Sequence, residues 1–239
     1  KLTHIVSRDQ AKAQKVIDEL GLVGVKWSAD YHALVEDDSL DIVVEVAGGI
    51  PMPKDFIMKA LKHGKTVVTA NKDLMAAHGH ELMELAEENG VDIFFEASVC
   101  GGIPILQAMK ESLAGNRFRQ VIGILNGTTN YILTAMSQKG QGFEEALAEA
   151  TRLGYAEADP TNDVENYDAG RKIAILASMA FNSRVTDAEV ATEGITKISK
   201  WDILYAKEFG YEIKSVGIAK CEDGDIEVRV HPVMLPQSH

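Results

Sequence analysis

The sequence predicts an α/β protein with a doubly wound parallel sheet, followed by a second domain of α+β structure. In the first half, short β-branched runs alternate with amphipathic stretches at spacings of about 20–25 residues, as right-handed βαβ units require. In the second half, strand and helix patterns no longer alternate. We therefore expect domains at 1–102 and 103–239, with ligands at the carboxyl ends of the first-domain strands.

Four β-branched or apolar runs predict the strands of the first domain, and three amphipathic stretches predict its helices. The strands are Thr3–Ser7, Asp41–Ala47, Thr66–Ala70 and Val91–Ala97, and the helices are Ala11–Leu20, Asp55–His63 and Gly79–Asn89. The chain does not begin with Met, and no G-x-G-x-x-G follows a first strand. We therefore expect a fragment that has lost its first βα unit.

The second domain is predicted to combine helices with a strand and a terminal hairpin. The helices are Ile103–Leu113, Thr129–Gln138, Phe143–Leu153, Tyr167–Phe181 and Lys200–Phe209, and the strand is Gln120–Leu125. Residues Gly154–Asn166 show no periodicity and predict a loop. Glu212–Lys220 and Ile226–Val230 flank a turn and predict a hairpin that is short of partners, so the end at His239 is also expected to be arbitrary.

Composition places the chain among globular proteins. Its 239 residues are 46% hydrophobic and 25% charged, and no apolar run reaches the roughly 18 residues needed to span a bilayer. We therefore expect no membrane partner, and because the formal net charge is −12, we expect no nucleic-acid partner. Cys100 and Cys221 cannot form a disulfide framework, which favours a cytoplasmic location. A small acidic enzyme is the resulting expectation.

Candidate cofactor contacts follow three of the predicted strands. Asn71 and Lys72 could orient a ligand and supply a cation, although a strand-to-helix turn with a solvated lysine is equally expected. Gly48, after Ala47, would let a flat ring approach the backbone, or could simply form a tight turn. Arg8 ends the strand that, in dinucleotide-binding folds, approaches the ribose. An acidic residue there binds the ribose 2′-hydroxyl and an Arg accommodates a 2′-phosphate, so Arg8 with Asp9 leaves the choice between NAD and NADP open, leaning to NADP. A surface Arg is nearly as good an interpretation.

The segment from Glu96 to Pro104 contains glycines and a proline at the predicted domain boundary. Its carbonyl oxygens, together with the Glu96 carboxylate, could bind a hard cation. A hinge is the stronger interpretation from the sequence alone. Cys100 could be a nucleophile, but no obvious His partner follows nearby, and a lone Cys is more often simply buried.

The strongest site pattern joins an acidic loop to the helix that follows it. The loop from Gly154 to Asp163 carries three carboxylates, and Asp168 and Lys172 follow at i and i+4. A surface ion pair is the alternative. The same stripe continues through Ile175, however, so we expect the pair to lie half-buried, as in a site with shifted proton affinities.

A further motif, Asn126-Gly127-Thr128-Thr129-Asn130, follows the strand Gln120–Leu125. Thr128 or Thr129 is expected to cap the next helix. The start of that helix could bind an anion, but a capped helix and nothing more is an equally good interpretation.

Taken together, these motifs resemble those of the homoserine dehydrogenase family. The similar segments are VVTANK (67–72), EASVCGGIP (96–104), GILNGTTNYIL (123–133) and LGYAEADPTNDV (153–164). The resemblance covers nearly the whole chain and implies a Rossmann-like first domain and a catalytic, dimerising second domain. It also implies reversible, NAD- or NADP-linked interconversion of L-homoserine and L-aspartate 4-semialdehyde, on the route to threonine and methionine.

The same resemblance implies roles for individual residues. Lys172 would exchange a proton with the substrate hydroxyl, and Lys72 would lie near the nicotinamide. The other implied contacts are Glu157, Asp163 and Asp168 for the amino-acid substrate, Arg8, Ala47, Gly48, Asn71 and Lys72 for the cofactor, and Glu96, Val99, Gly101 and Ile103 for sodium. Asn166 stands where the family usually has Gly, and Asn tolerates a left-handed backbone better than most residues.

Two rival functions fit the same sequence. A phosphorylating semialdehyde dehydrogenase would use Cys100 as a thiolate nucleophile, whereas the homoserine dehydrogenase interpretation does not need that thiol. A non-catalytic, dimerising module that binds the substrate would explain the missing phosphate-binding turn.

Overall fold

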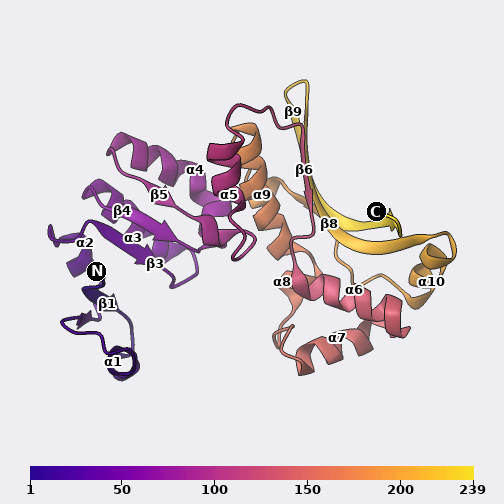
Figure 1. The fold of residues 1–239 in the computed structure, drawn as a ribbon, viewed down its shortest axis with the longest axis horizontal. Helices are drawn as coiled ribbons and strands as arrows, with labels where there is room; N and C mark the ends of the chain where they lie inside the picture. The colour runs from indigo at the N-terminus through magenta and orange to yellow at the C-terminus, as the bar shows by residue number, and fades with distance from the viewer. The chain divides into compact units, whose positions relative to one another are not determined.

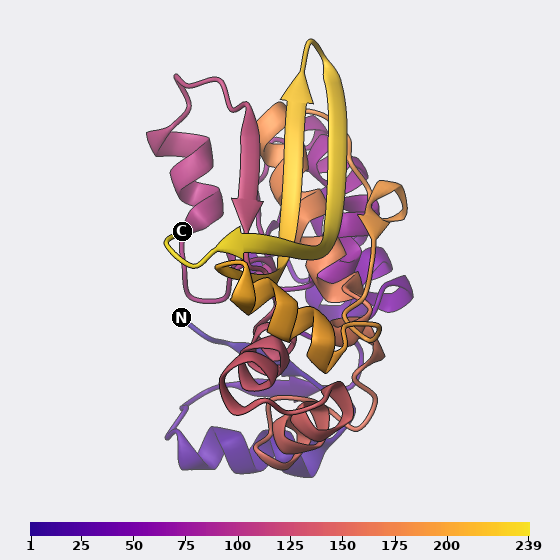
Figure 2. The same ribbon diagram turned by 90° about the vertical axis from the view of Figure 1, so that its right-hand side faces the viewer.

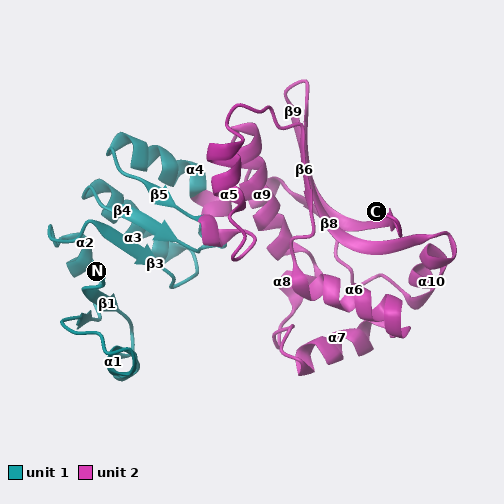
Figure 3. Cartoon of the chain, in the orientation of Figure 1, with its two compact units in different colours: residues 1–74, 79–95 teal, residues 75–78, 96–239 magenta.

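The computed structural model describes residues 1–239, which form two compact units (Figure 3). Unit 1 comprises residues 1–74 and 79–95, and unit 2 comprises residues 75–78 and 96–239. The predicted domain boundary between residues 102 and 103 stays a prediction. No helix of the structure is both long enough and apolar enough to cross a bilayer.

Unit 1 is an α/β unit whose strand pairs are all parallel (Figure 1). One sheet pairs β1 (His4–Val6) with β2 (Lys26–Ser28), and a second has the order β3 (Ile42–Glu45), β4 (Thr66–Thr69), β5 (Ile93–Phe94). The helices are α1 (Gln10–Glu19), α2 (His32–Val35), α3 (Pro51–Lys62) and α4 (Lys72–Glu88). The α/β class predicted from the alternating pattern is confirmed.

Two helices in unit 1 begin several residues earlier than predicted, because residues that favour a helix start set their first turn and not the apolar periodicity. α4 begins at Lys72 instead of Gly79, since the Asn71 side chain accepts a hydrogen bond from the Leu74 amide at 3.1 Å and caps the helix. α3 begins at Pro51, because proline fits the first turn of a helix. β2 and α2, of three and four residues, were not predicted.

Unit 2 is built on a mixed four-stranded sheet with the order β6-β8-β9-β7. Its strands are β6 (Gln120–Gly123), β7 (Ala191–Thr192), β8 (Tyr211–Glu222) and β9 (Asp225–Pro236). The helices are α5 (Ile105–Gln107), which continues as a π-helical turn over Ala108–Ser112, α6 (Gly127–Lys139), α7 (Phe143–Arg152), α8 (Thr161–Val164), α9 (Tyr167–Phe181) and α10 (Lys200–Glu208). The mixed class predicted for this half is confirmed.

Two predictions for unit 2 are wrong in detail. The hairpin β8–β9 does not lack partners, because β6 pairs antiparallel with β8 and β7 pairs parallel with β9. Those pairings join segments far apart in the sequence, so no local pattern signals them. The predicted loop 154–166 contains the short helix α8, whose four residues are too few to show a helical period in the sequence.

Helix α9 packs on one face of this sheet, over Gly217 of β8, which has no side chain. A Cβ on Gly217 would lie 2.7 Å from a methyl group of Leu125 and 3.4 Å from Cβ of Ile173, so glycine lets helix and sheet approach. The helix begins after Asn166, whose φ of 65° is left-handed, as expected of Asn at this position. The Asn166 side chain is buried and donates to the Glu193 carbonyl at 2.6 Å.

A polar cluster connects the end of α6 to α7 within unit 2. The Glu149 carboxylate accepts hydrogen bonds from Lys139 Nζ and Gln141 Nε2, each at 2.7 Å. Its side chain is 18% exposed. These hydrogen bonds, first that from Lys139 and then that from Gln141, lower the pKa of Glu149 from 4.5 to about 2.

This lowered pKa predicts a specific loss of stability in acid. A carboxylate with a lower pKa in the folded state stabilises it fully above pH 4.5 and loses that contribution as the pH falls toward about 2. We expect the urea midpoint of Glu149→Gln to fall less steeply across this window than that of the parent protein. Glu145→Gln, which removes an exposed carboxylate from the same helix, is the control and should follow the parent. Equal slopes for all three proteins would contradict the assignment.

Candidate functional site

The centre of the candidate site is an ion pair at the start of α9. Lys172 Nζ lies 2.6 Å from Asp168 Oδ2 and also donates to the Leu125 carbonyl at 2.9 Å. Asp168 is buried and Lys172 half-buried, while Ile175 on the same stripe is in the core. The arrangement expected from the i, i+4 spacing is therefore present, and the lysine amine has a fixed position.

Asn126 joins this pair to the acidic loop. Its Nδ2 donates to Asp163 Oδ1 at 2.6 Å and to Asp168 Oδ2 at 2.9 Å. Its Oδ1 accepts from the Thr129 amide at 2.9 Å, so Asn126 itself caps α6. The expectation that Thr128 or Thr129 caps this helix is wrong, because Asn at the first position already supplies the acceptor. Thr128 Oγ1 instead donates to the Tyr155 carbonyl at 2.7 Å.

Sequence reasoning therefore missed Asn126 as a member of the site. The only local signal was the preference of Asn for helix N-caps. Its partners Asp163 and Asp168 lie 37 and 42 residues further along the chain, and only the fold brings them together.

The other carboxylates of the acidic loop have different surroundings. Asp159 Oδ1 accepts from the Thr161 hydroxyl at 2.6 Å and from its amide at 3.1 Å, and these hydrogen bonds lower the pKa of Asp159. Glu157 is exposed on the loop before this turn. Of the three predicted substrate contacts, the structure thus gathers Asp163 and Asp168 around Asn126 and leaves Glu157 exposed.

Cys100 lies in unit 2, between Glu96 and α5, with a left-handed φ of 60°. Burial raises the pKa of its thiol. The positive charge of Lys172 lowers that pKa, and the charge of Glu96 raises it, without reversing the net effect. Because the raised pKa keeps the thiol protonated near neutral pH, the environment is unfavourable for a thiolate nucleophile.

The predicted sodium ligands surround the turn from Glu96 to α5. Glu96 Oε1 accepts from the Leu106 amide at 2.9 Å and Oε2 from the Gln107 amide at 2.8 Å, which fixes the carboxylate. Val99 is buried and Gly101 has a φ of 59°, so the chain reverses sharply here. A carboxylate has about four acceptor sites, so these two hydrogen bonds leave the Glu96 carboxylate with acceptor capacity, while Ile103 on the same segment is 64% exposed. The structure contains no cluster of three His, Cys, Asp or Glu side chains suited to a metal.

In unit 1, a buried carboxylate shapes the glycine turn after β3. Glu45 Oε1 accepts from the Ala47 and Gly48 amides at 2.7 and 3.1 Å, and Oε2 accepts from Thr69 Oγ1 at 2.7 Å. Gly48 and Gly49 both have left-handed φ values, which glycine adopts without strain. The Glu45 carboxylate therefore fixes the shape of this turn, and no side chain covers the backbone at Gly48 and Gly49.

The remaining cofactor candidates lie at strand ends in unit 1. Asn71 is buried and uses both ends of its amide within the protein, since Nδ2 donates to the Gly49 carbonyl at 2.7 Å and Oδ1 caps α4. The structure thus gives Asn71 a part in holding the glycine turn. Lys72 is the first residue of α4, and Arg8 is exposed just beyond β1.

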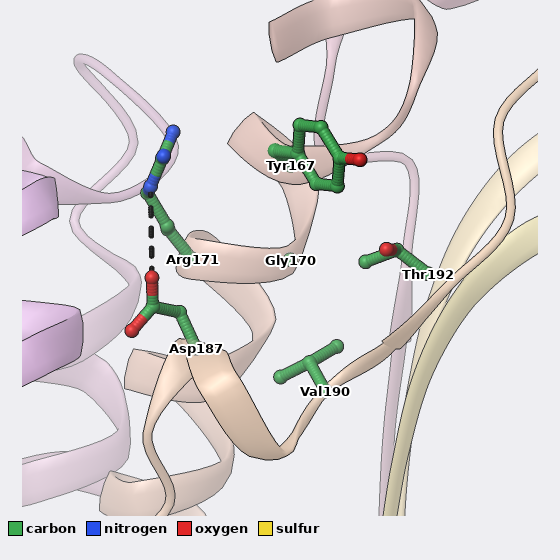
Figure 4. Close-up of a pocket in the computed structure, with 6 residues that line it drawn as sticks. All are labelled: Tyr167, Gly170, Arg171, Asp187, Val190 and Thr192. Carbon is green, nitrogen blue, oxygen red and sulfur yellow. Dashed lines mark ion pairs between the residues drawn. The ribbon is translucent and has the colours of Figure 1, made fainter.

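A separate hollow of about 200 Å³ lies beside another face of α9 (Figure 4). It is lined by Tyr167, Gly170, Arg171, Asp187, Val190 and Thr192. Arg171 Nε lies 3.8 Å from Asp187 Oδ2 across it, and NH1 donates to Asn162 Oδ1 at 3.2 Å. Because Tyr167 and Arg171 each precede a site residue by one position, they project about 100° away from Asp168 and Lys172. The hollow therefore contains none of the predicted site residues.

Comparison with known proteins identifies relatives of both units. The family model described as homoserine dehydrogenase matches residues 104–239, and the model described as homoserine dehydrogenase, NAD binding domain, matches residues 1–96. The homoserine dehydrogenase of Corynebacterium glutamicum is 52% identical over 217 residues, covering 88% of this chain and 48% of its own length. That of Bacillus subtilis is 48% identical, with 89% and 49% covered. The chain thus spans about half the length of these curated relatives.

Solved structures of homoserine dehydrogenases also match this chain. The crystal structure of a homoserine dehydrogenase from Thiobacillus denitrificans matches with a TM-score of 0.92 and 42% identity, covering 99% of this chain and 54% of that one. A hyperthermophilic archaeal homoserine dehydrogenase in complex with NADPH matches with a TM-score of 0.79 and 28% identity, covering 98% and 69%.

Proposed function

Because the chain belongs to the homoserine dehydrogenase family, we propose that it interconverts L-homoserine and L-aspartate 4-semialdehyde, with NAD or NADP as cofactor. One observation supports this proposal most strongly. The half-buried lysine Lys172 is fixed by Asp168 and the Leu125 carbonyl. The Asn126 amide holds a second carboxylate, Asp163, together with Asp168. A basic group next to carboxylates is what the oxidation of an amino-acid alcohol requires.

The proposed chemistry divides between proton transfer and binding. In the oxidation direction Lys172, as a neutral amine, accepts the proton of the substrate hydroxyl and becomes an ammonium, and in the reduction direction the ammonium returns that proton. Hydride transfer at the carbinol carbon is the chemistry that a bound nicotinamide would supply, and Ala47, Gly48 and Lys72 are proposed to hold that cofactor. The carboxylates of Asp168, Asp163 and Glu157 are proposed to bind the substrate ammonium group, since buried or half-buried cations need anionic partners.

The cofactor contacts are proposed for the strand ends of unit 1. The glycine turn held by Glu45 gives a flat ring access to the Ala47 and Gly48 backbone, and Lys72 supplies a positive charge. The exposed guanidinium of Arg8 favours NADP over NAD. The archaeal relative described as a complex with NADPH supports the same class of cofactor.

A cytoplasmic location and small-molecule partners complete the proposal. Cys100 and Cys221 are both free thiols, as a reducing compartment maintains them. The net charge of −12 opposes binding to a phosphate backbone.

Replacing Lys172 tests the proposed chemistry. We expect the protein to reduce NADP or NAD when L-homoserine is added, and Lys172→Ala to lower kcat/KM by about 10²–10⁴-fold, since the proton acceptor is lost. Lys139→Ala is the matched control, because Lys139 also makes a 2.7 Å ion pair in unit 2, but with Glu149. Cys100→Ser should stay within about twofold of the parent. Nicotinamide absorbance is the measurement.

Three outcomes would change this interpretation. Full turnover by Lys172→Ala would contradict its role, and loss of activity in Cys100→Ser alone would favour a phosphorylating semialdehyde dehydrogenase. Binding of L-homoserine without turnover by the parent protein, measured by calorimetry, would favour a non-catalytic substrate-binding module.

We also propose a sodium site at the turn formed by Glu96, Val99, Gly101 and Ile103. The oxygen donors there suit a hard cation. We expect activity and the thermal midpoint to fall when sodium chloride is replaced by tetramethylammonium chloride at equal ionic strength. Both should recover with a saturable dependence on added sodium. If neither quantity depends on sodium, the proposed site is wrong.

A homodimer is proposed through the sheet face of unit 2 that α9 does not cover (Figure 2). Ile122 is 54% exposed on this face and pairs with Ile218, which in turn pairs with Arg229. Exposed apolar side chains on a sheet face are typical of an interface, and here they lie among charged ones such as Lys220, Glu227 and Arg229. We expect Ile122→Lys to convert dimer to monomer in sedimentation velocity, while Val23→Lys, at a position 84% exposed in unit 1, should leave the dimer intact. An unchanged sedimentation coefficient for Ile122→Lys would contradict this interface.

A further inference from the structure

We infer that Asn126 is a positioning residue: its amide holds the Asp163 and Asp168 carboxylates side by side, in the orientation in which they meet the substrate and the Lys172 amine. This inference rests on the proposed function. The motif analysis and the resemblance both include Asn126, but neither implies this role for it.

The orientation of the Asn126 amide is fixed from within the protein. Its Oδ1 accepts from the Thr129 amide at 2.9 Å and from Thr129 Oγ1 at 3.1 Å. A flipped amide would turn its NH₂ group toward the Thr129 N–H and its oxygen toward two carboxylates, so only one orientation is compatible with these neighbours. The NH₂ group therefore faces the acidic side chains.

Both hydrogens of that NH₂ group are used on different carboxylates. One is donated to Asp163 Oδ1 at 2.6 Å and the other to Asp168 Oδ2 at 2.9 Å. Two carboxylates around a single nitrogen repel each other, and the repulsion grows as solvent is excluded. The amide offsets part of it without adding charge, and Lys172 Nζ donates at 2.6 Å to the same Asp168 oxygen that the amide contacts.

The backbone on either side of this residue is equally well fixed. Leu125, directly before it, offers its carbonyl to Lys172 Nζ at 2.9 Å, and α6 starts directly after it. The turn between β6 and α6 thus contacts the lysine through its main chain and both carboxylates through one side chain. A change in that side chain alone should disturb the carboxylates while the lysine keeps its carbonyl partner.

Asn126→Asp separates the capping role from the positioning role. Asp caps helices as well as Asn does, so α6 keeps its N-cap, but the two donors are lost and a third carboxylate faces the other two. Asn126→Ser also keeps a cap and loses the donors without adding charge. The swap Asn126→Asp with Asp163→Asn restores an amide–carboxylate contact at the 2.6 Å position and the original number of charges. Asn182→Asp, at the exposed end of α9, controls for one added charge.

Calorimetric titration with L-homoserine is the main measurement, so the result does not depend on turnover. We expect Asn126→Asp to weaken binding of L-homoserine by about tenfold or more and Asn126→Ser by less. The swap should bind more tightly than Asn126→Asp. Asn182→Asp should match the parent in its affinity for L-homoserine, and the affinity for NADP should stay unchanged in all variants.

The inference is overturned if Asn126→Asp and Asn126→Ser bind L-homoserine as the parent does. It is also overturned if NADP affinity falls in parallel with homoserine affinity, because that pattern describes a general loss of structure and not a loss of positioning at the carboxylates. A parent protein that binds L-homoserine but does not oxidise it would contradict the proposed function alone. A parent that does not bind it would overturn both.

Discussion

The contact between the β6–α6 turn and the start of α9 is the constraint on which the site in unit 2 depends. Lys172 reaches the Leu125 carbonyl and Asp168 reaches the Asn126 amide, so two segments more than 40 residues apart fix each other. α9 can come this close to the sheet because Gly217 leaves room for Leu125 and Ile173. The position of the lysine amine therefore follows from a glycine on a distant strand.

Much of this fold was predictable from periodicity and end signals. α9 follows the predicted Tyr167–Phe181 residue for residue, since its apolar stripe is long and Asn166 marks its start. The predictions failed where long-range pairing or a cap decides the outcome. Pairing of β6 with β8 and of β7 with β9 leaves no local trace, and Asn71 starts α4 well before the periodic segment begins.

The site was predictable to the extent that its residues are neighbours in the sequence. Asp168 and Lys172 are one helical turn apart, and their contact follows from that spacing. The bridge from Asn126 to Asp163 and Asp168 could not be predicted in the same way, because polar contacts across the fold depend on how two helices are placed on one sheet. An amide offers no charge pattern that would single it out in a sequence, whereas a lysine among carboxylates does.

Both units use the same arrangement at their candidate sites. In each, an asparagine shortly after a strand caps the following helix through Oδ1, and its Nδ2 holds a neighbouring segment: Asn71 holds the Gly49 carbonyl, and Asn126 holds two carboxylates. Because one side chain sets both the start of the helix and the position of the groups beside it, the two cannot shift independently. The cap thereby transmits the rigidity of the helix to a turn that would otherwise be free to move. This coupling gives a physical reason why binding groups at strand ends can keep a fixed geometry although they lie outside regular secondary structure.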